Sequence, residues 1–532
     1  MRLSYQGLQD KQAWEKIGVV LPKYDWRKVC AATAENPVWI HFGAGNIFRG
    51  FIAGLQSCLL DKGLADKGII AAETFDYEII DKIYSPHDSM TLMVSLKPDG
   101  TTDKSIIASI TEGVKADERE KLRRIFIAPS LQMASYTITE KGYALRDMNG
   151  DLLSVVKSDI ESGPENPHHA MSITASLLYE RFKAGAFPIA IVSMDNCSHN
   201  GEKLRASVLE IANEWEKRGF VGKDFTAWIS DESHVSFPWS MIDKITPRPA
   251  DSVKDELIAL GIEDIEPVIT SKHTYIAPFV NAEVPQYLVI EDRFPNGRPA
   301  LEKAGVYMTD RDTVNKTERM KVTTCLNPLH TALAVYGCLL GYTKIADEMT
   351  DPELKTLVER IGYKEGLPVV TDPGIINPRA FIDEVITQRL PNPFMPDTPQ
   401  RIAVDTSQKI PVRFGETLKS YKADPKLSPA SLVAIPLALA GWLRYLLGVD
   451  DNGNAMQVSP DPMLSELQTA LKPVRLGEPE SAEGVLDSIL DNRHLFSLSL
   501  KEVGLAEKVT GMFKELLRGP GAVRDTLKKY LR

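Results

Sequence analysis

The sequence is poor in cysteine and lacks the spacings of a disulfide framework or a zinc site. Its five cysteines are scattered over 532 residues, and no two of them form a C-x-x-C pair. This pattern is typical of reduced thiols, so we expect a cytoplasmic protein. The chain also turns polar within its first six residues, which argues against a signal peptide.

Long hydrophobic runs and blocks of positive charge are absent too. The most apolar stretch, residues 432–447, is shorter than the ~20 residues that cross a bilayer and contains Pro436 and Arg444, so we expect a buried helix. Acidic residues outnumber basic ones by 72 to 62, which gives a formal net charge of −10. An acidic chain without a basic cluster binds nucleic acid or anionic membrane poorly, and we expect neither partner.

The overall composition is that of a folded globular protein, and the length of 532 residues predicts more than one domain. Up to about residue 305, short apolar strands alternate with helical segments, whereas helical patterns dominate beyond it. We predict an α/β Rossmann-type domain over residues 1–305 and a mainly α-helical domain over residues 306–532. The expected strands are 38–42, 68–72, 125–128, 136–139, 189–193 and 287–290, and the expected helices are 48–60, 170–184, 201–215, 327–340, 352–361, 378–389, 431–447 and 506–517.

A glycine pair between the first strand and the first helix indicates a dinucleotide site. Gly43 would allow the tight turn, and Gly45 would let the backbone approach a pyrophosphate at the helix N-terminus. The usual third glycine is replaced by Phe48. Just past the second strand, Glu73 or Asp76 would accept hydrogen bonds from the ribose hydroxyls, which favours NAD over NADP. The sequence leaves the choice between these two acids open.

Residues 321–330 (KVTTCLNPLH) concentrate groups that suit carbonyl reduction. Pro328 fits the first helical position, which makes Asn327 the predicted N-cap, with His330 in the first turn. Lys321 is expected in an extended or looping approach. The developing alkoxide needs a hydrogen-bond donor and then a proton, which an Asn amide and a desolvated Lys can supply. Each residue also has an ordinary structural explanation: a helix cap, a core histidine or a surface lysine.

Six segments along the chain combine glycine, amide and charged residues in short motifs: residues 41–50 (HFGAGNIFRG), 139–143 (TEKGY), 195–201 (DNCSHNG), 243–247 (DKITP), 321–330 (KVTTCLNPLH) and 401–409 (RIAVDTSQK). Their sequences and their order resemble the mannitol dehydrogenase family of long-chain, polyol-specific dehydrogenases. The spacing from Lys321 to Asn327 is one residue longer than in the family pattern, Thr406 stands in place of a glycine, and Met194 replaces a common cysteine. These differences indicate a divergent branch.

The resemblance implies catalytic roles for residues of both predicted domains. Lys321 would be the general acid and base. Asn196 and Asn327 would stabilise the oxyanion, His330 would position the substrate, and Asp243 would contact it.

The resemblance also implies binding residues. Arg401 and Lys409 would line the substrate site, where two cations would suit a carboxylate. The residues expected to bind the cofactor are Gly43, Gly45, Asn46, Ile47, Phe48, Arg49, Glu73 and Asp76.

We therefore expect an NAD-dependent oxidoreductase that interconverts a keto-hexuronate and an aldonate, with reduction of D-fructuronate to D-mannonate preferred. The alternatives are mannitol 2-dehydrogenase or tagaturonate reductase activity and, from another class, a catalytically silent NAD-binding sensor. Cys197, His199, Cys325 and His330 lack zinc spacing, so the mechanism is expected to need no metal. The expected partner is a sugar acid or polyol, and the resemblance implies a monomer.

Overall fold

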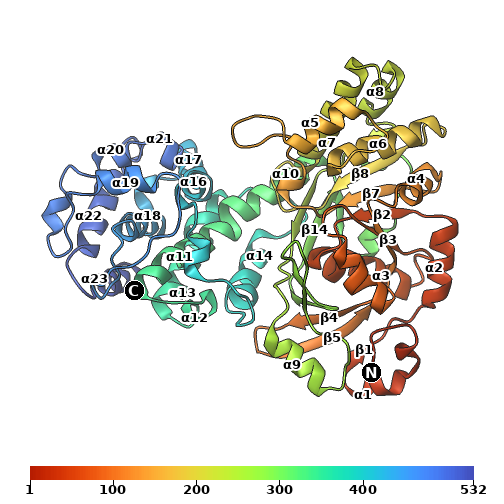
Figure 1. Ribbon diagram of the computed structural model, residues 1–532. Coiled ribbons are helices and arrows are strands. Elements are labelled where there is room, and N and C mark those ends of the chain that lie inside the picture. Colours follow the sequence, from red (N-terminus) through yellow and green to blue (C-terminus); the bar gives the residue numbers. More distant parts are fainter. The chain divides into compact units, whose positions relative to one another are not determined.

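The protein divides into two compact units in the computed structural model, which describes all residues from 1 to 532 (Figure 1). Unit 1 comprises Met1–Leu96 and Thr101–Asn315, and unit 2 comprises Lys97–Gly100 and Lys316–Arg532. The boundary falls within helix α10 (Arg311–Met320). The division of the chain into domains at residues 305 and 306 stays a prediction.

The centre of unit 1 is a six-stranded sheet in which every neighbouring pair is parallel. The strand that comes first in the chain lies in the middle, and the strand order reverses beside it, as in a Rossmann fold. The predicted Rossmann-type α/β unit is confirmed. Across the sheet the strands are β6 (Ile110–Lys115), β3 (Ile69–Glu73), β2 (Trp39–Phe42), β7 (Met133–Tyr136), β8 (Ile189–Ser193) and β9 (Val235–Ser236).

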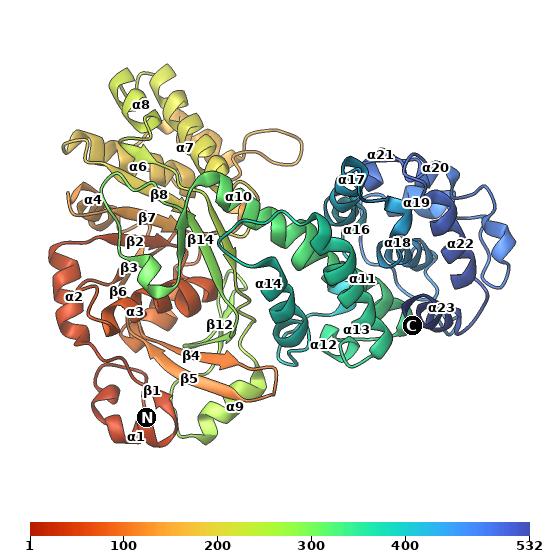
Figure 2. The same cartoon turned by 180° about the vertical axis from the view of Figure 1, so that it is seen from behind.

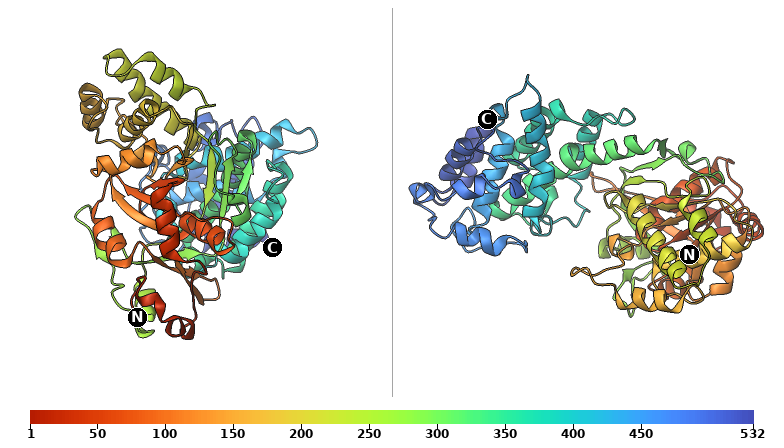
Figure 3. Two further views of the ribbon diagram at one scale, coloured as in Figure 1. Left: turned by 90° about the vertical axis from the view of Figure 1, so that its right-hand side faces the viewer. Right: turned by 90° about the horizontal axis from the view of Figure 1, so that it is seen from above.

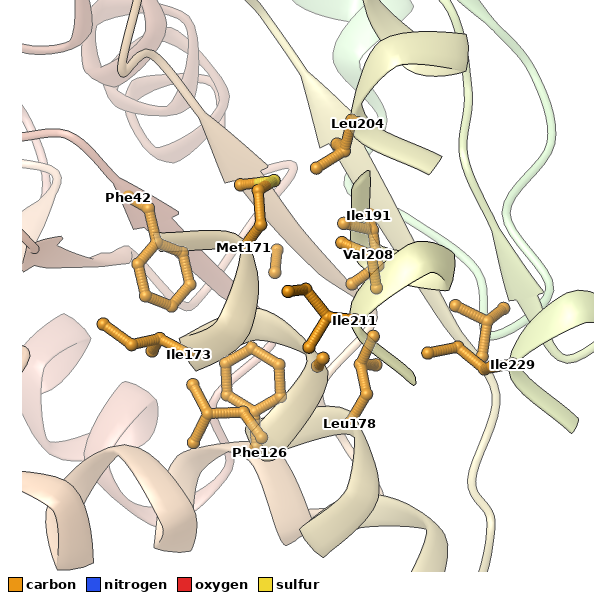
Figure 4. Packing of buried hydrophobic residues seen from close by; sticks show 14 of the residues in the cluster. Phe42, Phe126, Met171, Ile173, Leu178, Ile191, Leu204, Val208, Ile211 and Ile229 are labelled. Carbon is orange, nitrogen blue, oxygen red and sulfur yellow. The ribbon is translucent and has the colours of Figure 1, made fainter. Parts of the chain in front are cut away.

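One face of this sheet is covered by helices. Phe42 and Ile191 point from the sheet toward Phe126 and toward apolar side chains of the covering helices (Figure 4). Because successive side chains of a strand alternate between faces, the same strands supply a second core on the other side. The helices of this layer are α4 (Arg119–Ile127), α5 (Ser154–Ser162), α6 (Ala170–Lys183), α7 (Asn200–Lys217) and α8 (Lys223–Ser230).

The opposite face packs Trp39, Met133 and Val192 against the helical run after the glycine turn and against further strands. That run is a π-helical turn, η2 (Phe48–Ile52), continued by α3 (Ala53–Asp61). Figure 2 shows β4 (Thr91–Leu96) and β5 (Thr102–Ile107) at the side of unit 1 that also holds α1 (Lys11–Lys16) and α9 (Asp251–Ala259). The remaining elements are α2 (Trp26–Glu35) and three small sheets, formed by β1 (Val19–Val20), β5 (Thr102–Ile107), β4 (Thr91–Leu96) and β13 (Phe279–Glu283), by β10 (Ser240–Asp243), β14 (Tyr287–Glu291) and β15 (Tyr307–Thr309), and by β11 (Val268–Ile269) and β12 (Tyr275–Ile276).

One predicted strand of unit 1 is wrong, and another is displaced. Residues 125–127 form the end of α4 and Ala128 is its C-cap, because Leu122, Ile125 and Phe126 make one buried helical face. A short apolar run gives the same signal in a buried strand and in a helix. The strand expected at 136–139 is β7, which ends at Tyr136.

Unit 2 contains helices and isolated bridges but no β-strand, which confirms the predicted helical part (Figure 3). Its core is built around α11 and α18, whose side chains are almost all buried; α18 occupies the apolar run 432–447. The α-helices of this unit after α10 are α11 (Asn327–Leu340), α12 (Ile345–Glu348), α13 (Pro352–Glu359), α14 (Pro378–Glu384), α15 (Pro399–Ile402), α16 (Thr406–Ile410), α17 (Glu416–Ala423), α18 (Ala434–Tyr445), α19 (Leu464–Ala470), α20 (Asp487–Leu490), α21 (Arg493–Phe496), α22 (Ala506–Leu516) and α23 (Ala522–Leu531).

Four π-helical turns interrupt or extend the helices of unit 2. Such turns are rare and are found frequently at functional sites. They are η7 (Lys321–Cys325), η8 (Arg360–Gly366), η10 (Val385–Arg389) and η11 (Pro411–Gly415). No helix of either unit combines the length and the apolarity needed to cross a bilayer.

Candidate functional site

The two glycines of the β2 turn meet different surroundings. Gly43 has φ +105°, and a Cβ there would lie 2.1 Å from the Thr137 carbonyl oxygen. Its amide donates to the carbonyl of Ala72 (2.8 Å). A Cβ on Gly45 would meet nothing within 4 Å. The packing of the protein therefore requires glycine at 43, whereas the space beside 45 is open to a ligand at a helix N-terminus, as a dinucleotide site needs.

Phe48 occupies the position of the missing third glycine. Its side chain is fully buried, and its ring stacks on His41 with centroids 4.0 Å apart. Close packing is supplied two residues later by Gly50, where a Cβ would lie 2.7 Å from Val280 Cγ1. Phe48 is thus part of the core, and only its backbone could face a cofactor.

Of the other residues predicted to bind the cofactor at this turn, Arg49 and Ile47 face the protein interior, whereas Asn46 has a side-chain oxygen that could bind a ligand. The buried Arg49 guanidinium donates to Thr91 Oγ1 (3.2 Å) and to the Ala277 carbonyl (2.8 Å), and burial lowers its pKa to about 10. Ile47 packs against the core. Asn46 has a buried side-chain oxygen with no partner in the chain, which is an available acceptor at the start of the helix.

Both candidate ribose-binding acids are buried, but they have different partners. Glu73 accepts from the Ala44 amide through Oε2 (2.9 Å) and from the amides of residues 74–76 through Oε1. Asp76 accepts from the Thr270 hydroxyl through Oδ2 (2.6 Å), while its Oδ1 has no partner. Glu73 therefore fixes the strand end to the glycine turn, and Asp76 keeps an unused acceptor.

Asp195 joins two motifs that lie more than 50 residues apart. Its Oδ2 accepts from the Ile138 amide (2.8 Å) and the Tyr143 hydroxyl (2.6 Å), and its Oδ1 accepts from the Thr139 amide (3.0 Å). Thr139 has φ +65°, a conformation that this carboxylate helps to hold. Burial raises the pKa of Asp195, and the three donors oppose that effect. The next residue is Asn196, so the network fixes the loop that carries this predicted catalytic amide.

A second buried amide links this loop to the strand of Asp243. Asn200 donates to the carbonyls of Asp195 and Ser240 (3.0 Å each) and accepts from the Ser240 amide (3.0 Å). Ser240 begins β10, and Asp243 ends it. The hydrogen bonds of Asn200 therefore connect the loop that carries Asn196 to the strand that carries Asp243 within unit 1.

The predicted approach of Lys321 to its helix is wrong. Lys321 is 3% exposed and opens the π-helical turn η7, which directly follows α10. The predicted N-cap is also wrong, because Leu326 is the cap and Asn327 is the first residue of α11. The Leu326 amide donates to the Lys321 carbonyl five residues back (3.1 Å), and Leu326 itself leaves the helical conformation (φ −129°, ψ −62°), so the cap lies one residue before the expected position. The Asn327 side-chain amide has no partner in the chain and is only partly buried.

His330 lies one turn into α11 among cations. Its Nε2 is 3.6 Å from Asp397 Oδ2. Burial, followed by Arg413, Arg401, Arg389 and Lys409, lowers the pKa of His330 to about 3. The ring is therefore neutral near pH 7, and its buried Nε2 has no hydrogen-bond partner in the chain.

The two cations predicted to line the substrate site have different surroundings. Arg401 has a side chain that is 60% exposed and pairs with Asp397. The Lys409 ammonium donates to the carbonyls of Ile402 (2.9 Å) and Val404, and burial lowers its pKa to about 8. Lys409 therefore holds its own loop closed.

Some functional candidates were missed from the sequence. Arg413 follows Lys409 by four residues, a spacing that could have placed both on one helical face. Tyr143 and Asn200 lay inside recognised motifs, but only the folded structure shows that they hold other residues. No group of three or more His, Cys, Asp or Glu side chains across residues 1–532 could hold a metal ion, and metal independence stays a prediction.

Comparisons with known proteins agree with this arrangement. Residues 38–303 match the mannitol dehydrogenase Rossmann domain, and residues 313–517 match the mannitol dehydrogenase C-terminal domain. The chain is 56% identical to D-mannonate oxidoreductase of Thermotoga maritima over 537 residues, covering 100% of this chain and 99% of the relative. It is 30% identical to D-mannonate oxidoreductase of Escherichia coli K12, covering 81% of this chain and 84% of the relative.

Solved structures show the same similarity. The ternary complex of Pseudomonas fluorescens mannitol 2-dehydrogenase with NAD and D-mannitol has a TM-score of 0.70 and 26% identity, covering 99% of both chains. D-sorbitol dehydrogenase in substrate-free form has a TM-score of 0.79 and 25% identity, covering 97% of this chain and 98% of the other. The predicted family is confirmed: the chain belongs to the mannitol dehydrogenase family.

Proposed function

We propose that the protein is an NAD-dependent oxidoreductase that interconverts D-fructuronate and D-mannonate. The observation that carries the substrate class is the set of four cations around His330, since a keto-hexuronate brings a carboxylate and a neutral ketose does not. The 56% identity to D-mannonate oxidoreductase of Thermotoga maritima supports the same assignment. The expected enzyme class and cofactor agree with the family.

The turn of unit 1 fits the cofactor. The open space at Gly45, the unpaired oxygen of Asn46 and the unused acceptor of Asp76 lie on the segments expected to contact the pyrophosphate and ribose. Glu73 organises this surface through four backbone amides. When bound, NAD supplies or accepts the hydride, and its binding is the part of the function that unit 1 supports.

The residues of the chain act on the oxygen of the reacting carbon. Lys321 donates a proton to the developing alkoxide in reduction and takes one in oxidation. Asn196 and Asn327 donate hydrogen bonds to that oxygen. The neutral His330 ring bonds a substrate hydroxyl, and Asp243 contacts the substrate.

A cytoplasmic location is also part of the proposal. All five cysteines are free, which suits a reducing compartment. The monomeric state stays a prediction, and size-exclusion chromatography with light scattering measures it.

The test is NADH consumption by the purified chain with EDTA present, using D-fructuronate, D-tagaturonate, D-fructose and fructose 6-phosphate. Turnover confined to D-fructuronate supports the proposal and metal independence. Turnover of D-tagaturonate or D-fructose alone assigns the protein to tagaturonate reductase or mannitol 2-dehydrogenase activity. NADH binding without turnover of any of these compounds supports the silent sensor.

A further inference from the structure

Arg413 is a partly buried cation that lacks an acidic partner. It lies in the π-helical turn η11, and no carboxylate of the chain comes within the 4.0 Å of an ion pair. Its one hydrogen bond goes from Nη1 to the Thr331 hydroxyl. Burial lowers its pKa to about 10, so the guanidinium stays charged near pH 7. Most of its N–H donors are unused, and none of them is sealed from solvent, so they are open to an anionic ligand.

The single bond of Arg413 ties it to the proposed catalytic helix. The Thr331 hydroxyl donates to the Asn327 carbonyl (2.9 Å) while it accepts from Arg413. Thr331 is the neighbour of His330 in α11. The guanidinium is thus fixed one residue from His330 and two hydrogen bonds from Asn327.

The other cations near His330 are engaged in the chain. Arg401 pairs with Asp397, and the Lys409 ammonium is held by two backbone carbonyls. Arg389 is buried in a second π-helical turn, η10, and contributes charge. Against these four cations stand three acids: Asp397 beside His330, and Asp405 and Asp461 near Lys409. The balance is positive, and the N-terminus of α11 adds to it.

We propose that Arg413 binds the carboxylate of the substrate and sets the preference for sugar acids over neutral ketoses. The planar guanidinium donates two parallel hydrogen bonds to the two oxygens of a carboxylate, and Thr331 orients the guanidinium by accepting from Nη1. Lys409 is then a positioning residue that holds the loop after Arg401. This inference rests on the proposed function, because it names the group that recognises the acid end of the substrate.

The test compares Arg413→Met, Arg413→Lys and a control, Arg493→Met, in the full chain. Arg493 is an exposed arginine of unit 2 that pairs with Glu502 and has no part in the site. The readouts are kcat and KM for the keto-hexuronate that the wild type reduces best, the same constants for D-fructose, and NADH affinity from fluorescence.

We expect Arg413→Met to lower kcat/KM for the keto-hexuronate on the order of 10²-fold, mainly through KM, since a hydrogen-bonded charge is lost. Arg413→Lys should recover part of this loss, because it keeps the charge and loses the fork. NADH affinity, D-fructose turnover and Arg493→Met should stay within threefold of the wild type.

Two results would overturn the inference while leaving the proposed function intact. One is keto-hexuronate kcat/KM within threefold of the wild type in Arg413→Met; the other is an equal loss on both substrate types. If Arg413→Met loses NADH affinity or its cooperative unfolding transition, the variant has not folded correctly and Arg413→Lys decides. A wild-type KM for the keto-hexuronate in Arg413→Lys would then refute the role of the guanidinium. A wild type that reduces only neutral ketoses overturns both proposals.

Discussion

Asp195→Asn tests whether the buried carboxylate positions the proposed catalytic amide of Asn196. The carboxylate has three donors: two on Oδ2, from the Ile138 amide and the Tyr143 hydroxyl, and one on Oδ1, from the Thr139 amide. An asparagine of the same shape keeps its carbonyl where two donors converge. Its NH₂ group then faces the Thr139 amide, donor against donor.

The magnitude follows from that geometry. One charge-assisted hydrogen bond is lost at about 1.5–3 kcal/mol, and the two that remain weaken with the loss of charge. If about 2–3 kcal/mol of this appears in the barrier, kcat falls about 30- to 150-fold. The effect should appear in kcat more than in NADH affinity, because the glycine turn is not part of this network.

The matched control is Tyr143→Phe, which removes one donor and creates no repulsion. It should lower kcat about tenfold at neutral pH. Because the Tyr143 bond lowers the pKa of Asp195, its loss should raise that pKa further, and protonated Asp195 resembles asparagine. The acid limb of the kcat profile should therefore move to higher pH in Tyr143→Phe. A wild-type kcat in Asp195→Asn, when Asn196→Ala is impaired, would refute the reasoning.

Three further predictions follow from single residues. Gly43→Ala should lower the free energy of unfolding by about 2–4 kcal/mol. Gly45→Ala should keep the stability of the wild type but bind NADH at least tenfold more weakly. The same stability and the same NADH affinity in the two variants would contradict this difference. Lys321→Ala should lower kcat about 10²- to 10⁴-fold with little change in KM or NADH affinity, and unchanged turnover would remove Lys321 from the mechanism. Burial raises the pKa of Glu348 from 4.5 to about 10, so the folded chain keeps a proton that the unfolded chain releases. From pH 5 to 8, the free energy of unfolding of the wild type should fall by about 1.4 kcal/mol per pH unit relative to that of Glu348→Gln. Denaturant titrations that give the same pH dependence for both proteins would exclude a buried, protonated Glu348.

The sequence predicted correctly those helices, strands and turns that depend on interactions between residues close together in the chain. The strand at residues 189–193 and the helix at 327–340 are found with the predicted bounds, because each has a run of apolar residues ended by turn residues. The glycine turn was recognisable since Gly43 meets a steric requirement of the backbone. The strand expected at 125–128 failed for the opposite reason: four apolar residues carry no period that separates a helix face from a strand.

The side chains that hold the site residues in place could not be predicted from the spacing of residues in the sequence, because they make contacts between segments that are distant in the chain. Asp195 contacts residues 138–143, and Arg413 contacts Thr331, which is 82 positions away. Lys409 shows the same limit. Its residue type and motif suggested a free cation, while the fold gives its ammonium two backbone carbonyls.

The longer interval between Lys321 and Asn327 has a structural explanation in the π-helical turn η7. A π-helical hydrogen bond spans five residues instead of four, so one turn takes up one extra residue, and the chain leaves the helical conformation only at Leu326, the cap of α11. In an α-helical turn, the same insertion would rotate every following side chain by about 100°. The bond from the Leu326 amide to the Lys321 carbonyl shows that the turn absorbs the residue before α11 begins. The extra residue therefore gives no physical reason to expect a silent protein. Arg389 and Arg413 lie in π-helical turns as well, so turns of this kind hold the proposed acid and base Lys321, the proposed carboxylate-binding Arg413 and a third cation that adds positive charge near His330.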